Sequence, residues 1–122
     1  MVDDNDLGLI AKRPIANGAW RANENPNVHS APTNYAEEYF RRAGIMTRLG
    51  NIIDEPEDRI MTSMGYIFSF NDIDVGIIGT QNPKHLLSNI DMYSECLKIS
   101  REVINELNRR FDEFGKNWDQ RT

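Results

Sequence analysis

This sequence has one cysteine, no long apolar run and no excess of basic residues, and each shortage excludes a class of protein. The single cysteine, Cys96, cannot form a disulfide within the chain or build a cysteine-rich zinc site. No apolar stretch approaches the roughly 20 residues that cross a bilayer. The formal net charge of −5 argues against a general nucleic-acid binder, which needs a basic face. The sequence therefore predicts neither a membrane protein nor a nucleic-acid partner.

The chain has enough apolar residues for one globular domain. It contains 122 residues, of which 39% are hydrophobic. A complete (β/α)8 barrel needs on the order of 200 to 250 residues, so a whole barrel is excluded. Asp3, Asp4 and Asp6 occupy the place where a signal peptide carries basic residues. We expect a soluble cytoplasmic protein with an acidic tail over residues 1–6 and one domain over residues 7–122.

Periodicity predicts a strand, a long loop, two helices, a second strand and two more helices. Alternating strands and helices favour an α/β fold with parallel strands. The two predicted strands are apolar on both faces, and a two-stranded sheet leaves its outer edges unpaired. Either a partner supplies further strands, or the chain is part of something larger. The expected ranges, in chain order, are 7–11, 21–33, 34–49, 54–70, 75–78, 83–90 and 100–111. We expect Ser100 to cap the last helix, Phe111 to lie on its buried face and Trp118 to pack back on it.

Residues 75–89 form the most informative stretch. A short apolar strand turns on Gly79, Thr80 and Gln81 and enters a helix at Asn82 and Pro83. Asn82 is a good N-cap, and proline is well placed in a first helical turn. Backbone N–H groups and the positive end of the helix dipole can bind an anion there. An ordinary βα turn that binds nothing is the alternative interpretation.

Two segments of the sequence are similar to aldo/keto reductases. The run IIGTQNPKHLLSNI resembles the last barrel strand, phosphate loop and following helix of that family. The upstream run GLIAKRPIANGAW resembles the preceding strand and its loop in one bacterial-type branch. The segment YAEEY, and the pair Arg110-Phe111 followed by Trp118, are also similar to that branch. The resemblance covers nearly the whole chain from about Leu7.

The resemblance implies the C-terminal part of a (β/α)8 TIM barrel, comprising its last two parallel strands and their helices. It implies NADP or NAD as cofactor, held at its adenosine end. The positions it assigns to the cofactor are Arg13, Pro14, Ile15, Gly79, Thr80, Gln81, Asn82, His85 and Asn89. The first three would touch the pyrophosphate, and the next four would lie along the 2′-phosphate and ribose. The histidine would face the adenine or phosphate, and the last asparagine the adenine edge.

Two departures from the family pattern affect its implied function. Many members carry a basic residue in place of Gly79 and an arginine in place of His85, so the choice between NADPH and NADH stays open. The catalytic Asp, Tyr, Lys and His of the family have no counterpart in this sequence. We therefore expect a C-terminal fragment of a carbonyl reductase that has no catalytic residue and is inactive alone.

Other interpretations apply to several of these features. The chain can instead be a non-catalytic α/β interaction domain that oligomerises, or pairs with a partner such as a complementary barrel half, through exposed strand edges. His29 has no second ligand at metal-binding spacing, and we predict no metal site. Lys12 and Arg13 are either a phosphate-binding pair or a solvated basic pair. Tyr35, Tyr39 and Phe40, at helical spacing, favour a core stripe over a stacking platform.

Overall fold

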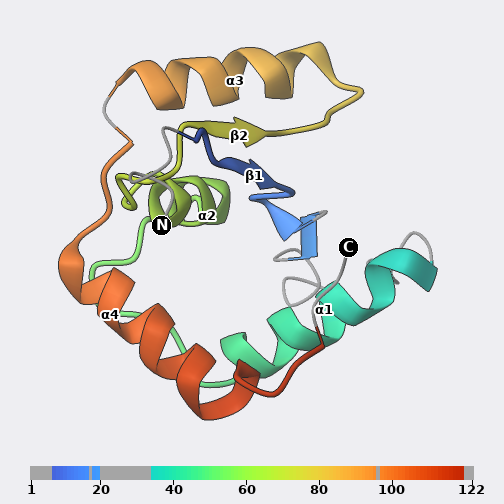
Figure 1. Cartoon of the computed structure of the whole chain (residues 1–122), viewed down its shortest axis with the longest axis vertical. Helices are drawn as coiled ribbons and strands as arrows, with labels where there is room; N and C mark the ends of the chain where they lie inside the picture. Colours follow the sequence, from blue (N-terminus) through green and yellow to red (C-terminus); the bar gives the residue numbers. More distant parts are fainter. Residues whose placement is uncertain (1–6, 17, 20–33, 96, 120–122) are drawn as a thin grey trace. The chain divides into compact units, whose positions relative to one another are not determined.

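Two short parallel strands and four α-helices make up the described structure. The computed structural model describes residues 7–16, 18–19, 34–95 and 97–119. Within them the sheet has two strands and does not close. Figure 1 shows the elements β1 (Ile10–Lys12), α1 (Asn34–Thr47), α2 (Arg59–Ile67), β2 (Val75–Ile77), α3 (Pro83–Ser94), α4 (Arg101–Arg110) and the π-helical turn η3 (Phe111–Gly115). Their order confirms the predicted alternation of strands and helices.

The chain separates into two units, which we describe one at a time. Unit 1 combines Met1–Ile15 with Pro56–Ile99, and unit 2 combines Ala16–Glu55 with Ser100–Thr122. Unit 1 therefore holds both strands together with α2 and α3. Unit 2 holds α1, α4 and η3. The two strands are distant in sequence, and the chain between them passes through unit 2.

The strand pair of unit 1 is parallel, as the sequence predicts. Ile10 pairs with Val75, and Lys12 pairs with Ile77. A side-chain bond extends the pairing, because the Leu9 N–H donates to Asp74 Oδ2 at 2.7 Å. The Asp74 and Val75 N–H groups both donate to the Leu9 carbonyl. The first strand therefore begins and ends later than expected, and the second is one residue shorter.

The strand side chains are not covered on both faces, contrary to the prediction. Ile10, Val75 and Ile77 are 56%, 48% and 53% exposed. An apolar run is buried on both faces only where further strands and helices lie against it. Each strand here has three residues and one paired neighbour among the described residues. The composition of the strands is that of an interior sheet, but their surroundings are those of an edge.

Helix α2 supplies most of the buried core of unit 1. Residues 62–65 are all buried, although Thr62 Oγ1 has no hydrogen-bond partner among the described residues. The helix begins at Arg59, later than expected, because Asp58 is in an extended conformation, while Pro56 disfavours helical backbone at the residue before it. Asp58 provides the N-cap by accepting from the Ile60 N–H at 2.8 Å. The acidic residues ahead of the helix thus include its N-cap.

Unit 2 is built on α1 and α4. The Ser100 hydroxyl caps α4, as predicted, by accepting from the Val103 N–H at 3.3 Å. Val103 is fully buried, while Ile104 and Leu107 are half-buried. On α1, Glu38 pairs with both Arg41 and Arg42. Glu38 therefore contacts Arg42 at a spacing of four residues and Arg41 at a spacing of three.

The end of α4 departs from the predicted apolar face. The chain continues through η3, and Phe111 and Phe114 are 48% and 38% exposed. Trp118 returns to the helix end as predicted, and its ring makes an edge contact with Phe111 at 6.3 Å between ring centroids. The Arg42 guanidinium lies 5.1 Å from the Trp118 ring.

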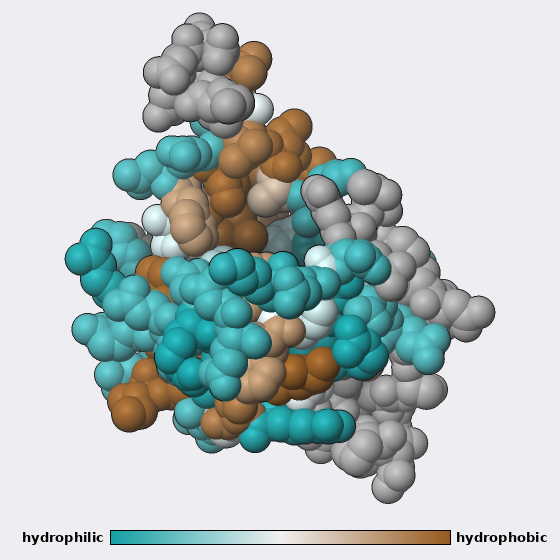
Figure 2. All heavy atoms as spheres, turned by 60° about the horizontal axis from the view of Figure 1, so that its bottom comes forward, coloured by the Kyte–Doolittle hydropathy of each residue, from teal (hydrophilic) through white to brown (hydrophobic). Residues whose placement is uncertain are grey.

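Polar side chains cover much of one face of the molecule. Figure 2 shows teal hydrophilic side chains over much of one face, with brown apolar side chains between them. No helix in the described ranges is both long and apolar enough to cross a membrane. This agrees with the charged composition and the absence of a long apolar run.

Candidate functional site

The predicted cofactor loop connects β2 to α3 in unit 1. The first residue of α3 is Pro83, and Asn82 is its N-cap in extended conformation. Asn82 Oδ1 accepts from the Lys84 N–H at 3.0 Å. The Asn82 N–H in turn donates to Thr80 Oγ1 at 3.2 Å. The sequence-based prediction of a strand, a small-residue turn and a proline-opened, asparagine-capped helix is confirmed as local structure.

Most N–H groups at this helix start already have partners. The His85 and Leu86 N–H groups both donate to the Asn82 carbonyl, and the Lys84 N–H is taken by the cap. No hydrogen bond within the described residues uses the N–H of Gln81. An anion at this place would therefore contact the loop before the cap, or replace the asparagine side chain as acceptor. The turn and the helix dipole are in place for an anion, but most backbone N–H groups at the helix start are already hydrogen-bonded within the protein.

The register of the strands brings the two predicted cofactor segments to one edge of the sheet. Lys12 is level with Ile77, so Arg13 and Ile78 both follow at the carboxyl ends of parallel strands. In parallel sheets this edge is where ligands bind. Arg13 has a positive φ of 61°, which turns the chain sharply as β1 ends. Arg13, Pro14 and Ile15 are half-buried, whereas residues 79–82 are exposed.

The two predicted adenine contacts on α3 differ in exposure. His85 is exposed in the first turn, and Lys84 beside it is exposed as well. Asn89 is 9% exposed and is the buried residue of α3. A contact between Asn89 and an adenine would need a neighbouring surface that meets this side of the helix. The assignment of these two residues to a cofactor stays a prediction.

The described residues contain no group of three or more His, Cys, Asp or Glu side chains that could hold a metal ion. His29 and the single cysteine, Cys96, lie outside the described residues. The long loop over residues 21–33 and the acidic tail over residues 1–6 also lie outside them.

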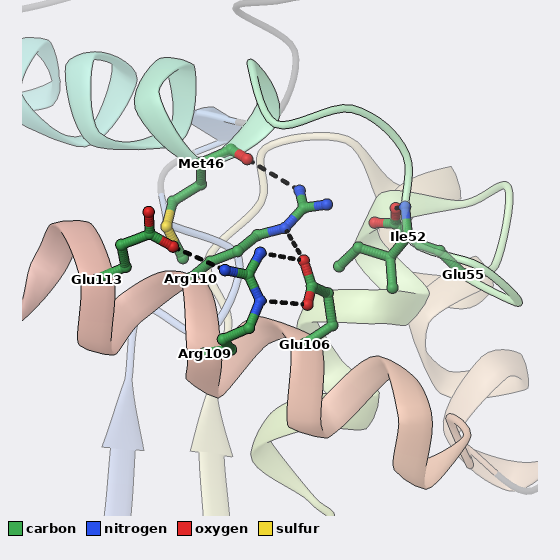
Figure 3. A network of polar contacts seen from close by, with 7 residues as sticks. All are labelled: Met46, Ile52, Glu55, Glu106, Arg109, Arg110 and Glu113. Carbon is green, nitrogen blue, oxygen red and sulfur yellow. Dashed lines mark hydrogen bonds and ion pairs between the residues drawn. The ribbon is translucent and has the colours of Figure 1, made fainter.

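A second polar cluster, not predicted from the sequence as a unit, lies in unit 2. Figure 3 shows Arg110 directed from α4 toward the carboxyl end of α1. Its guanidinium donates to the Met46 carbonyl at 2.9 Å and to Glu106 Oε1 at 2.8 Å. Glu106 also accepts two bonds from Arg109, which contacts Glu113 as well. In the sequence, this cluster could be recognised from Glu106, which lies three residues before Arg109 and four before Arg110, the spacings at which helical side chains form ion pairs.

This second cluster is organised to hold helices together. Arg110 is 5% exposed, and its donors satisfy a carbonyl at the end of α1. The hydrogen bonds from Arg109 and Arg110 lower the pKa of Glu106 to about 2, so this carboxylate stays charged. A carboxylate that remains ionised and already accepts three bonds is a poor general acid or base at neutral pH. We assign the cluster a structural role.

Comparisons of this sequence with protein-family models, with curated proteins and with solved structures found no match. The resemblance to aldo/keto reductases therefore stands on the residues quoted above and on their order in the chain.

Proposed function

We propose that this chain is the C-terminal portion of an NAD(P)H-dependent aldo/keto reductase that carries the adenosine-side cofactor loop. The observation that supports the proposal most directly is the parallel register of β1 and β2. It sets the segment beginning at Arg13 and the loop over residues 79–82 at the same edge. These are the two segments in which the sequence resembles the family. The exposed apolar strands also suit a sheet that continues into further strands of a barrel.

In the parent reaction a hydride passes from NAD(P)H to a carbonyl carbon, and a tyrosine acid gives its proton to the carbonyl oxygen. The products are an alcohol and NAD(P)⁺. This chain has no residue that matches the family's catalytic Asp, Tyr, Lys or His. We therefore propose cofactor binding by this chain and no turnover by it alone. A complementary barrel half would supply the catalytic residues.

Nucleotide titration followed residue by residue tests this proposal. We expect NADPH or NADH to shift the amide NMR resonances of residues 79–82 and of Arg13, and to leave unit 2 unchanged. Gln81→Glu adds one negative charge to the loop without changing its shape. It should weaken NADPH binding by about tenfold, and NADH binding less, because NADH lacks the 2′-phosphate.

Asn51→Asp is the matched control, since it also converts an exposed amide into a carboxylate, but in unit 2. It should leave nucleotide binding within experimental error. A folded chain that binds neither nucleotide, or that binds both equally well with Gln81→Glu and with Asn51→Asp, would refute the proposed cofactor loop.

The second candidate function is a non-catalytic domain that pairs its strand edges with another chain. The exposure of Ile10, Val75 and Ile77 favours it, because exposed apolar strands with free edges recruit further strands. Ile77→Lys should then abolish self-association while nucleotides have no effect on the protein. Nucleotide binding by a monomer, with no association at any concentration, would exclude this second candidate.

A further inference from the structure

Helix α3 leaves an apolar stripe exposed. Leu86, Leu87 and Ile90 are 51%, 61% and 52% exposed, and their spacing places them on one side of the helix. Asn89, which is buried, and Met92, which is half-buried, lie on the adjacent side. The helix is thus held to unit 1 by a different side from the one that carries its leucines. Among the described residues, nothing covers this stripe completely.

The charges along the border of this stripe oppose the helix's own dipole. Lys84 is in the first turn, while Asp91 and Glu95 are at the carboxyl end, and all three are exposed. A helix is stabilised by acidic residues at its start and basic residues at its end. In α3 neither is present in its terminal turns. The stability of an isolated helix therefore does not explain this arrangement.

An antiparallel copy of the same helix is complementary both to the apolar stripe and to the charges along its border. Reversing the helix brings its acidic end beside the basic start of the first copy, and it sets the two dipoles in opposite directions. If Leu87 of one copy packs against Ile90 of the other, Lys84 lies within one helical turn of Asp91 and Glu95 of the second copy. A two-fold axis repeats each contact, as isologous interfaces require.

We propose that a second copy of this chain docks on the stripe of α3, with the two helices antiparallel and Lys84 facing Asp91 and Glu95 across the interface. One helix pair buries less area than a standard interface of about 800 Å² per partner, so the dimer belongs to the weak, transient class. Its ion pairs are exposed and weaken as salt screens them, while the leucine contacts do not. The proposal does not depend on nucleotide binding.

Charge reversal on the whole chain tests the proposed register. Sedimentation velocity over roughly a hundredfold range of concentration should show a monomer–dimer equilibrium. Lys84→Glu should weaken the dimer by about tenfold, because it sets like charges together. Combining it with Asp91→Lys and Glu95→Lys should restore the dimer. Lys98→Glu is the matched control, since this exposed lysine follows α3 in the chain, and it should change association little.

An apolar variant tests the stripe itself. Leu87→Gln should abolish the dimer, whereas Ile53→Gln, at a site that is 82% exposed in unit 2, should not. Circular dichroism should show all variants equally helical. A chain that is monomeric at every concentration overturns the proposal. A dimer that survives Leu87→Gln but is broken by Ile77→Lys also overturns it, because strand edges would then form the contact. A charge reversal that fails to restore association overturns it as well.

Discussion

The two units place their apolar and charged residues differently. In unit 2, Val103 is fully buried, and the buried Arg110 joins two helices through the Met46 carbonyl. In unit 1, both strands and the stripe of α3 leave apolar side chains about half exposed. Unit 2 also exposes apolar side chains, such as Ile53 and Phe111, but more of the exposed large apolar residues in the described ranges lie in unit 1. Unit 1 therefore retains more surface that favours burial against something else. Proposals about function therefore concern unit 1, and the strongest internal contacts are expected in unit 2.

The largest expected effect on stability comes from Arg110. Replacing it with alanine leaves the Met46 carbonyl without the guanidinium that donates to it. It also removes the buried positive charge that pairs with Glu106. We expect Arg110→Ala to lower the free energy of unfolding by about 3 kcal/mol. Arg109→Ala is the control and should cost about 0.5 kcal/mol, because that side chain is 54% exposed. Urea unfolding measures both, and equal losses would contradict the structural role of Arg110.

A matched pair of valines compares the two units directly. Val103→Ala removes two methyl groups from a fully buried side chain in unit 2 and should cost about 2 kcal/mol. Val75→Ala removes the same groups from a side chain that is 48% exposed, on strand β2 of unit 1. This replacement should cost less than about 1 kcal/mol. Thermal unfolding of both variants checks this difference. A larger loss for Val75→Ala would mean that its strand is covered in solution.

Glycine replacements examine the packing within unit 1. A Cβ on Gly65 would lie 2.6 Å from Ile99 Cγ2, so Gly65→Ala forces Ile99 or α2 to move. Overpacking costs about 1 to 3 kcal/mol, and the better helix propensity of alanine returns about 1, so a net loss near 1 kcal/mol is expected. A Cβ on Gly79 would meet no atom within 4 Å, and Gly79→Ala should be close to neutral in urea unfolding. Equal stability of the two variants would show that Ile99 does not pack on α2.

The smallest expected effect is a dependence on pH. Hydrogen bonds from Arg41 and then Arg42 lower the pKa of Glu38 from its usual 4.5 to about 2. A lowered carboxyl pKa stabilises the folded state above the unfolded value, and this stabilisation is lost as the pH falls from about 4.5 to about 2. Glu38→Gln should flatten that part of the stability curve measured by acid titration. An unchanged curve would mean that the pair with Arg41 and Arg42 does not form in solution.

The sequence was informative wherever local chemistry decides the structure. Asn82 and Ser100 act as N-caps because their side-chain oxygens reach nearby N–H groups in any helix that starts there. The parallel arrangement of the strands followed from the order of elements. The later start of α2 also has a local cause, since Pro56 and Asp58 are both visible in the sequence. The predicted start near residue 54 lay ahead of the first apolar residue of the helix, Ile60, which is inside the observed α2.

Burial was the property that the sequence predicted poorly. The strands and the end of α4 were expected to be covered because their residues are apolar. Yet Ile77 and Phe111 are about half exposed. Apolar composition states what a side chain favours, but it does not supply the neighbour that buries it. The same limit applies to the cofactor loop, whose local geometry was predicted while Asn89 proved to be buried.

The sequence by itself determined the order of elements, the helix caps and the turn from β2 into α3, because each depends on residues that are close along the chain. Tertiary structure alone decided that Arg110 would be buried on the Met46 carbonyl, that Gly65 would meet Ile99, and that the apolar side of α3 would stay uncovered. These outcomes depend on which segments meet in space, and contacts between residues far apart in the chain are not encoded in local periodicity.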